Sequence, residues 1–307
     1  MISSLVIHAS DKNRYIDDMG VLTIPKEIKH LECSGLNINR LIIPDTIEKL
    51  GCSHNKLTHL DVPKSMQKLY CHDNKLTSLK IHGKIKWLNC SNNKLTFLDV
   101  PEGIQKLNCS GNKLTFLDVP EGIQKLDCSD NMLTLLKVPG TIKNLNCSHN
   151  KLTYLDAPKG VKRLGCYNNK LNSLNVSEGI QYIGCSGNNL THLNVPKGVQ
   201  KLWCSNNKLI YIEAPESLKY LIISNNKTLV YPPKEYQSKP TNEIVEYCKE
   251  NKVPQRLLLR QRYKERWNII RLMYIAHYKE DFESKTFNFN KIPVEVITGI
   301  ITRYVLT

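Results

Sequence analysis

The chain has 307 residues, with 43 Lys and Arg against 28 Asp and Glu, which gives a formal net charge of +15 at pH 7. No run of 18 apolar residues occurs, and the N-terminus has neither a basic start nor a long apolar stretch, so the sequence predicts no membrane span and no signal peptide. The positive charge favours acidic partners over basic ones.

Residues 1–30 are expected to cap a repeat array. Ile24 and Ile28 already follow the pattern of the later units, but Arg14 stands where that pattern places cysteine. The first unit of a stack must cover apolar surface that later units bury against one another, so an atypical sequence is expected there. Residues 5–7 are predicted to supply the capping strand.

From Leu31 to Asn226 a pattern returns every 19 residues without insertion or deletion, within a repeat array that is expected to span residues 31–233. One unit, from Ile104, reads I-x-x-L-x-C-x-x-N-x-L-x-x-L-x-V-P-x-x. The clearest marker is a column of ten cysteines, with Ile223 in the eleventh place: Cys33, Cys52, Cys71, Cys90, Cys109, Cys128, Cys147, Cys166, Cys185 and Cys204. A fixed period of roughly 20 to 30 residues indicates a solenoid of stacked units.

This pattern resembles the leucine-rich repeat, with cysteine in place of the second strand leucine of L-x-x-L-x-L-x-x-N-x-L. The resemblance implies an α/β-type solenoid, a right-handed array with short parallel strands on a concave face. A small all-α module is expected after the array. Prolines such as Pro101 and Pro120 interrupt the short convex return, which is therefore expected to be extended or 3₁₀. Repeats this short are similar to those of bacterial effectors and of uncharacterised giant-virus (mimivirus-type) proteins.

The periodic cysteines are expected to point inward as free thiols. Free cysteine behaves as a small buried hydrophobe, and ten equivalent thiols offer no reason for one disulfide pairing over another. A straight column also cannot place four sulfurs tetrahedrally around zinc. We therefore expect no metal, no cofactor and a reducing, intracellular compartment, which would be the cytoplasm, or the host cytoplasm if the chain is viral.

A second column holds asparagine three residues after each cysteine position, from Asn55 to Asn226. An amide has two donors and an acceptor, so a buried asparagine at each turn can satisfy backbone groups of its own and the adjacent coil. Because an unpaired buried group costs about 1 to 3 kcal/mol, this column is interpreted as structural.

Outward strand positions carry the candidate binding residues. They are Tyr70, Trp87, Tyr167, Tyr182, Trp203, Tyr220, Lys49, Lys68, Lys106, Lys125, Arg163 and Lys201. Aromatic and arginine side chains supply much of the energy of protein interfaces, which favours a protein-recognition scaffold with an acidic partner. Nucleic acid or another polyanion remains an alternative partner. A solvated face without a ligand is a further interpretation, because repeat duplication copies lysines whether or not they bind.

The array is predicted to end at Pro233, before a linker at residues 234–240 and a helical module at residues 241–307. Apolar residues at helical spacing predict helices from about 241 to 251, from about 254, and from Pro293.

Residues 291–301 resemble the opening of F-box-like segments. The resemblance implies that Val294, Ile297 and Ile301 dock on a ubiquitin-ligase adaptor, and that the chain is a substrate receptor for the ligase. The competing interpretation is a helix that only packs against its neighbours.

No enzyme is predicted. Histidines such as His54 and His72 occupy different repeat positions, and the pattern fixes no nucleophile or carboxylate beside them. Bacterial effectors with similar repeats can carry a cysteine-based ubiquitin-ligase domain. The C-terminal module is too short for that domain, and Cys248-Lys-Glu lacks its Cys-x-Asp motif.

Overall fold

The computed structural model describes residues 4–237 and 239–251. The chain divides into two compact units, residues 1–251 and 252–307, and the described residues belong to the first. The helices predicted from about 254 and from Pro293, with the docking residues Val294, Ile297 and Ile301, lie outside the described residues. No helix within the described ranges is long and apolar enough to cross a membrane.

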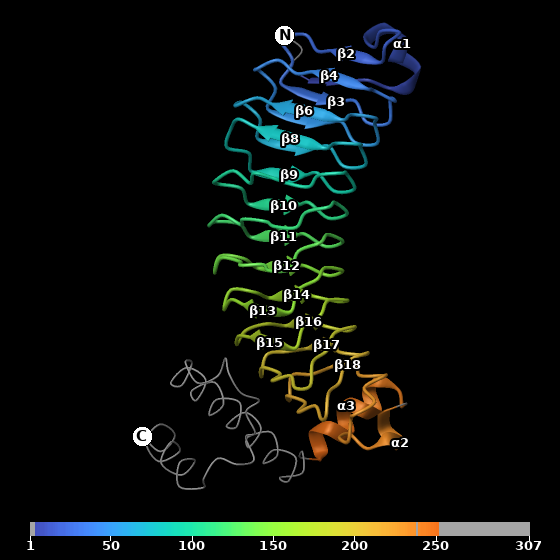
Figure 1. Ribbon diagram of the computed structural model, residues 1–307, viewed down its shortest axis with the longest axis vertical. Helices are drawn as coiled ribbons and strands as arrows, with labels where there is room; N and C mark the ends of the chain where they lie inside the picture. Colours follow the sequence, from blue (N-terminus) through green and yellow to red (C-terminus); the bar gives the residue numbers. More distant parts are fainter. Residues whose placement is uncertain (1–3, 238, 252–307) are drawn as a thin grey trace, which may run out of the picture. The chain divides into compact units, whose positions relative to one another are not determined.

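The repeat array is a parallel-strand solenoid (Figure 1) in which one short strand per coil joins a 12-stranded sheet. The strands are β1 (Ser4–Val6), β3 (His30–Glu32), β5 (Lys49–Gly51), β7 (Lys68–Tyr70), β9 (Trp87–Asn89), β10 (Lys106–Asn108), β11 (Lys125–Asp127), β12 (Asn144–Asn146), β14 (Arg163–Gly165), β16 (Tyr182–Gly184), β17 (Lys201–Trp203) and β18 (Tyr220–Ile222). Between β3 and β18, neighbours pair at the repeat interval, as Lys106 pairs with Lys125, so each sequence column becomes a row across the sheet. At the N-terminal edge, β1 pairs with β3 as the expected capping strand.

The return side of the coils is extended, as predicted. Three pairs of short parallel strands form there: β2 (Val21–Thr23) with β4 (Arg40–Ile42), β6 (His59–Val62) with β8 (Ser78–Ile81), and β13 (Tyr154–Ala157) with β15 (Ser173–Val176). Throughout residues 16–233, all of which the structure describes, no helix forms. Proline in most returns explains this, because it lacks an amide donor and fixes φ.

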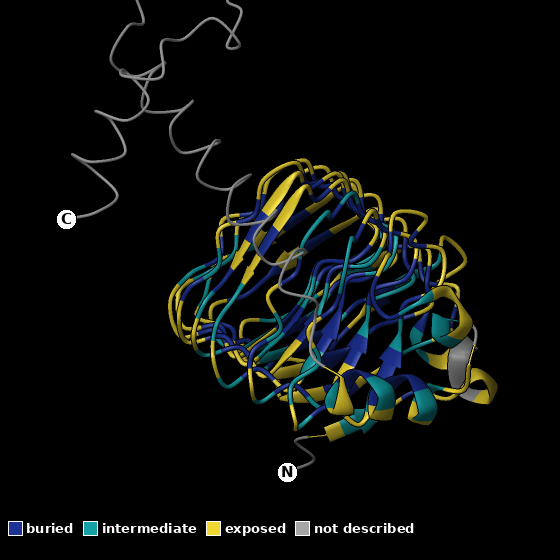
Figure 2. Cartoon of the chain, turned by 90° about the horizontal axis from the view of Figure 1, so that it is seen from below, coloured by how far each residue is buried: buried dark blue, intermediate teal, exposed yellow. Residues whose placement is uncertain are grey.

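The interior of each coil is apolar, and the ten periodic cysteines are completely buried in it. Figure 2 shows buried residues inside the coils and exposed residues on their outer bends. All these thiols are free. Burial raises the pKa of Cys90, Cys147 and Cys185 to about 12, and that of Cys109 well above its usual range. The ladder is therefore a packed apolar column, as the strand phase predicted.

The asparagine column ties successive coils together. Asn112 Oδ1 accepts a hydrogen bond from the amide of Leu95 in the preceding coil, at 3.0 Å. Asn112 Nδ2 donates to the carbonyls of Cys90, at 3.0 Å, and Cys109, at 3.1 Å. The same bonding recurs from Asn55 to Asn226. The structural interpretation of this column is confirmed.

The residue before each asparagine has a left-handed backbone conformation, which was not predicted from the repeat pattern. These residues, together with Gly35 at the equivalent position of the first full unit, have φ between 49° and 72°. They are Gly35, His54, Asp73, Asn92, Gly111, Asp130, His149, Asn168, Gly187, Asn206 and Asn225. Only glycine, asparagine, aspartate and histidine occur in the column, and these are the types that tolerate this conformation best. That restricted composition was the signal in the sequence.

Short helices lie near both ends of the described unit. A 3₁₀ turn η1 (Ala9–Asp11) and a short α1 (Lys12–Tyr15) lie in the expected cap. The expected linker contains α2 (Lys234–Gln237), and α3 (Thr241–Glu250) matches the first helix expected in the C-terminal module. Because α3 contacts β18 and buries Ile244, Val245 and Cys248, it packs with the array instead of starting a separate module at 241.

Candidate functional site

The outward face of the sheet is hollowed into a groove of about 680 Å³ that runs across strands β7 to β17. Polar, basic and aromatic side chains of successive coils line it, together with the strand leucines between them. Most of the predicted binding residues are among the lining: Tyr70, Trp87, Lys106, Lys125, Arg163, Tyr167, Tyr182 and Trp203. The sheet therefore forms the concave surface that the repeat pattern indicated.

The other predicted binding residues flank the groove. Lys68 and Lys201 contact aromatic rings of its lining, and Tyr220 lies 5.5 Å from Trp203 between ring centroids. Lys49 pairs with Lys68 one strand further out. All of them lie in the same rows as the lining residues, but their role in binding stays a prediction.

The indole of Trp87 is held between two lysines. The Nζ atoms of Lys68 and Lys106 lie 4.1 and 3.9 Å from the ring centroid, and they come from the strands on either side. Tyr182 is flanked in the same way by Arg163, at 4.4 Å, and Lys201, at 5.7 Å. Each such contact is worth about 0.5–1 kcal/mol at an exposed site, so the rings favour these positions of the cations.

Basic side chains outnumber acidic ones in the lining of the groove. Within the described part of the chain, Lys106, Lys125 and Arg163 form no ion pair. Asp127 is the acidic residue of the lining, and its Oδ1 accepts hydrogen bonds from the amide and hydroxyl of Ser129 at 3.1 and 2.7 Å. The groove therefore offers three cations to a negatively charged ligand, and two of them, Lys106 and Arg163, lie against aromatic rings.

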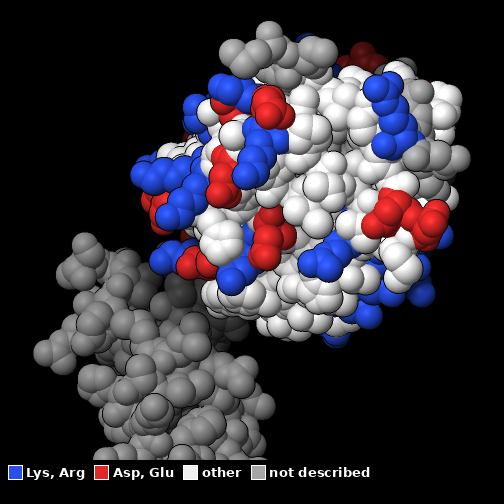
Figure 3. All heavy atoms as spheres, turned by 90° about the horizontal axis from the view of Figure 1, so that it is seen from above, with Lys and Arg blue, Asp and Glu red and all other residues white. Residues whose placement is uncertain are grey.

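Charge is arranged differently at the N-terminal end. Figure 3 looks along the array from that end, where Lys and Arg project from the outline with Asp and Glu among them, while most of the surface between is uncharged. Charges of both signs are therefore mixed in this view of the described residues.

A glycine makes room for one of the groove tyrosines. Tyr167 takes a place that is serine in most coils, and its side chain lies across Gly184 of the next coil. A Cβ at Gly184 would overlap the phenol oxygen, so any larger residue would displace the ring. Burial raises the pKa of Tyr167, as expected for a phenol held against the sheet.

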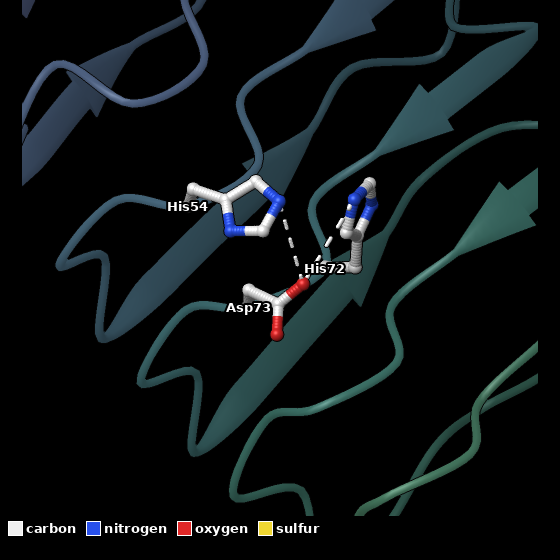
Figure 4. A group of neighbouring side chains, drawn as sticks. All are labelled: His54, His72 and Asp73. Atoms are coloured by element: carbon white, nitrogen blue, oxygen red, sulfur yellow. Dashed lines mark ion pairs between the residues drawn. The ribbon is translucent and has the colours of Figure 1, made fainter.

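Two histidines and an aspartate meet beside the end of the groove (Figure 4). His54 Nε2 and His72 Nε2 lie 3.6 and 3.9 Å from Asp73 Oδ2. The expectation that no carboxylate lies beside these histidines was wrong. His54 and Asp73 are 19 residues apart in the left-handed column, so stacking of the coils places them side by side.

The fold defines a class: this is a leucine-rich-repeat solenoid. No protein-family model and no curated protein sequence matches the chain. Among solved structures, the functional domain of InlJ from Listeria monocytogenes, which includes a cysteine ladder, is 25% identical with a TM-score of 0.61. YopM from Yersinia enterocolitica WA-314 is 23% identical with a TM-score of 0.58.

The InlJ match covers 69% of this chain and 56% of that one, and the YopM match 66% and 52%. The chain thus spans little more than half the length of either structure. These likenesses support the leucine-rich-repeat fold and the similarity to bacterial repeat proteins. They do not bear on the resemblance to giant-virus proteins, which stays a prediction.

Proposed function

We propose that this chain is a non-enzymatic recognition scaffold that binds an acidic segment of a partner protein in the groove. The observation that carries the proposal is the row of unpaired cations, Lys106, Lys125 and Arg163, on a concave sheet. Solenoids of this kind provide extended concave binding surfaces, and complementary charge on a partner adds specificity and speed of association.

The alternative ligand is nucleic acid or another polyanion. The basic row would serve it, since phosphate contacts need little more than positive charge. Single-stranded nucleic acid also stacks its bases on the faces of aromatic rings. In this groove, cations already lie over the rings of Trp87 and Tyr182, so the stacking surface is occupied. This favours an acidic protein segment.

The test compares two ligands of equal charge, an acidic peptide and a single-stranded oligonucleotide, by fluorescence anisotropy at several salt concentrations. The groove variant is Lys106→Gln with Lys125→Gln and Arg163→Gln. A matched control changes the same number of exposed cations on the turns, namely Lys94→Gln, Lys113→Gln and Lys151→Gln. The proposal expects peptide binding that weakens at least about tenfold in the groove variant, a loss of about 1.4 kcal/mol, and not in the control.

Three results would contradict the proposal. One is equal loss in both variants, because net charge alone would then explain binding. Another is tighter binding of the oligonucleotide with a steep decline against log salt, which indicates phosphate contacts. The third is no peptide binding at all.

The second alternative, docking of Val294, Ile297 and Ile301 on a ubiquitin-ligase adaptor, concerns residues outside the described ranges. Co-precipitation with a purified Skp1-type adaptor, using the intact chain and a chain truncated after Asn290, tests it. Capture that survives truncation would exclude this segment as the docking element.

The proposed compartment is intracellular and reducing, namely the cytoplasm. Its support is the column of buried free thiols, because disulfides rather than free thiols accumulate in oxidising compartments. Fractionation of cells that express the chain tests this proposal, and recovery of the chain outside the cytoplasm would contradict it.

A further inference from the structure

We propose that His54, His72 and Asp73 form a binding site for a divalent transition-metal cation, with zinc as the best-suited ion. One ligand atom from each residue lies within 4.8 Å of the other two. Imidazole nitrogen with a carboxylate oxygen is a donor set that zinc prefers, whereas calcium and magnesium take oxygen ligands. The three ligand residues are not among the lining of the groove, although His72 Nδ1 lies 3.2 Å from Asn89 Nδ2, which belongs to that lining.

The separations fit a shared ion better than direct hydrogen bonds. His54 Nε2 and His72 Nε2 are 3.6 and 3.9 Å from the same oxygen, Asp73 Oδ2. A hydrogen bond from an imidazole would require about 2.7–3.2 Å. Around a tetrahedral zinc with bonds of about 2.1 Å, two ligand atoms lie about 3.4 Å apart. The two nitrogen–oxygen separations are therefore within about 0.5 Å of those around a tetrahedral zinc, and the three ligand atoms lie within 4.8 Å of one another.

Hydrogen bonds between coils fix the backbone at two of the ligand residues. His54 and Asp73 both have φ of 54° on equivalent turns of adjacent coils. The amide of His54 donates to the carbonyl of His72 at 3.0 Å, and the amide of Asp73 donates to Ser91 at 3.1 Å. Ligand residues on turns that are hydrogen-bonded in this way need little backbone reorganisation to bind an ion.

The carboxylate is oriented by a second hydrogen bond. Asn92 Nδ2 donates to Asp73 Oδ1 at 3.0 Å, which leaves Oδ2 directed at the two imidazoles. Outer partners of this kind fix ligand geometry at metal sites.

The environment of His72 Nδ1 bears on which ring nitrogen is free. Ser53 Oγ lies 2.8 Å from Nδ1 and 3.3 Å from the Tyr70 carbonyl, which can take the hydroxyl proton. Oγ then accepts from Nδ1–H, and the Nε2 lone pair faces Asp73, as a metal ligand requires. Asn89 Nδ2 lies 3.2 Å from the same Nδ1 and, as a donor, favours the tautomer with the proton on Nε2. A cation bound at Nε2 would instead favour the tautomer with the proton on Nδ1.

The site is open to solvent on one side. The His54 side chain is 64% exposed, against 27% for His72 and 34% for Asp73. Three protein ligands with an open position leave room for a water molecule or an outside ligand atom as the fourth. The buried cysteine ladder does not compete in the folded chain, because its thiols are enclosed in the core.

The repeat offers a matched control site. His149 occupies the same column as His54, but the next coil there places Tyr167 and Asn168 where His72 and Asp73 would be. Asn168 Nδ2 lies 3.3 Å from His149 Nε2, so an uncharged amide replaces the carboxylate. A single histidine beside an amide is not a chelating set.

The experiment uses folded, reduced chain without a polyhistidine tag. Binding of Zn²⁺ is measured by calorimetry and binding of Co²⁺ by visible absorption, with His54→Asn, His72→Ser and Asp73→Asn as site variants. Each replacement is the residue found at that column in other coils, such as Asn92 or Ser91, so the fold should be kept. The controls are His149→Asn and Asp130→Asn. Melting temperature is not used, because unfolding exposes eleven cysteines that bind zinc themselves.

The proposal expects one Co²⁺ per chain with visible d–d bands and no thiolate charge-transfer band. Affinity should fall at least about tenfold in each site variant and stay unchanged in both controls. Three results would overturn it: site variants that bind as tightly as the parent chain, a sulfur charge-transfer band in the folded parent, or no saturable binding of either ion by the parent.

Discussion

At the scale of single residues, the asparagine column does more for this fold than its polar character suggests. Asn112 accepts one backbone hydrogen bond and donates to carbonyls of two coils, all of them out of contact with water. A leucine-rich core alone would leave these groups unpaired at every turn. The amide therefore couples each coil to the one before it.

Replacing this amide should destabilise the array strongly. Asn112→Ala is expected to lower the free energy of unfolding by about 1 to 3 kcal/mol for each buried group that it leaves unpaired. Urea unfolding followed by circular dichroism measures the loss. Lys113→Ala, one residue further on and exposed, is the control and should stay within about 0.5 kcal/mol of the parent chain. Equal effects at both positions would contradict the role assigned to the amide.

The thiols of the ladder should be unreactive until the chain unfolds. Burial raises their pKa, so the attacking thiolate is scarce and the sulfur is enclosed. A thiol reagent at neutral pH is expected to label the native chain slowly and all eleven cysteines after denaturation. Rapid native labelling, or native disulfides found by mass spectrometry, would disprove the packed ladder.

The same pKa values predict an alkaline loss of stability. A group whose folded pKa is raised contributes stability below its unfolded pKa and loses it as pH rises through the folded value. For Cys90, Cys147 and Cys185 that window runs from about 9.0 to about 12. Urea midpoints measured from pH 7 upward should fall above pH 9. A Cys90→Ala, Cys147→Ala variant should show a shallower fall, since lysine and tyrosine titrations are common to both chains.

At the scale of elements, adjacent strands determine which side chains meet. Tyr167 lies in the coil that begins with β14, and Gly184 ends β16, so only their pairing brings the phenol over the glycine. The cations over Trp87 arise in the same way, from β7 and β10 on either side of β9. The groove is therefore a property of neighbouring coils.

A double-mutant cycle tests the tyrosine and glycine contact. Gly184→Ala should destabilise the chain, because the added methyl group overlaps the phenol oxygen, and overpacking of this kind costs about 1–3 kcal/mol. In a Tyr167→Ser background, which restores the residue of most other coils, the same change should cost little. Urea unfolding of the four chains gives the coupling energy. A coupling energy near zero would mean that the two residues do not interact.

At the scale of the whole described unit, each coil of the solenoid contacts only the adjacent coils. The two terminal coils have one neighbour each, so the ends of the array are its least stable parts. The N-terminal edge is covered by β1, which pairs with β3, and the other end by α3, which packs on β18. The helix supplies Ile244, Val245 and Cys248 to that contact. It replaces the coil that would otherwise bury the last strand.

Weakening this cap should open the array locally. Ile244→Ala removes part of a buried side chain, a change that typically costs about 2–5 kcal/mol. Hydrogen exchange is expected to accelerate at β18 and β17 but not at β10, because the interaction between repeats is between nearest neighbours. Glu246→Ala, on the exposed side of α3, is the control. Uniform acceleration along the sheet would instead indicate global cooperativity.

The 19-residue period by itself determined the solenoid, the inward cysteines, the asparagine turns and the outward rows that line the groove. It could do so because a constant period forces equivalent residues into equivalent places in every coil. Its limit was set by the same regularity. The repeat pattern predicts where a column lies but not its backbone conformation. In the sequence, the left-handed turns appear only as a restriction of the position before each asparagine to Gly, Asn, Asp and His.

Stacking alone decided what each column meets in the next coil. The cations over Trp87, the phenol over Gly184 and the approach of His54 to Asp73 all join residues of adjacent coils. At the C-terminal end, α3 packs on β18 because the last coil leaves apolar surface uncovered there. The spacing of apolar residues along the helix does not specify which surface the helix covers. Such contacts depend on rotamers and on distances of a few ångströms, which appear only when the coils are assembled.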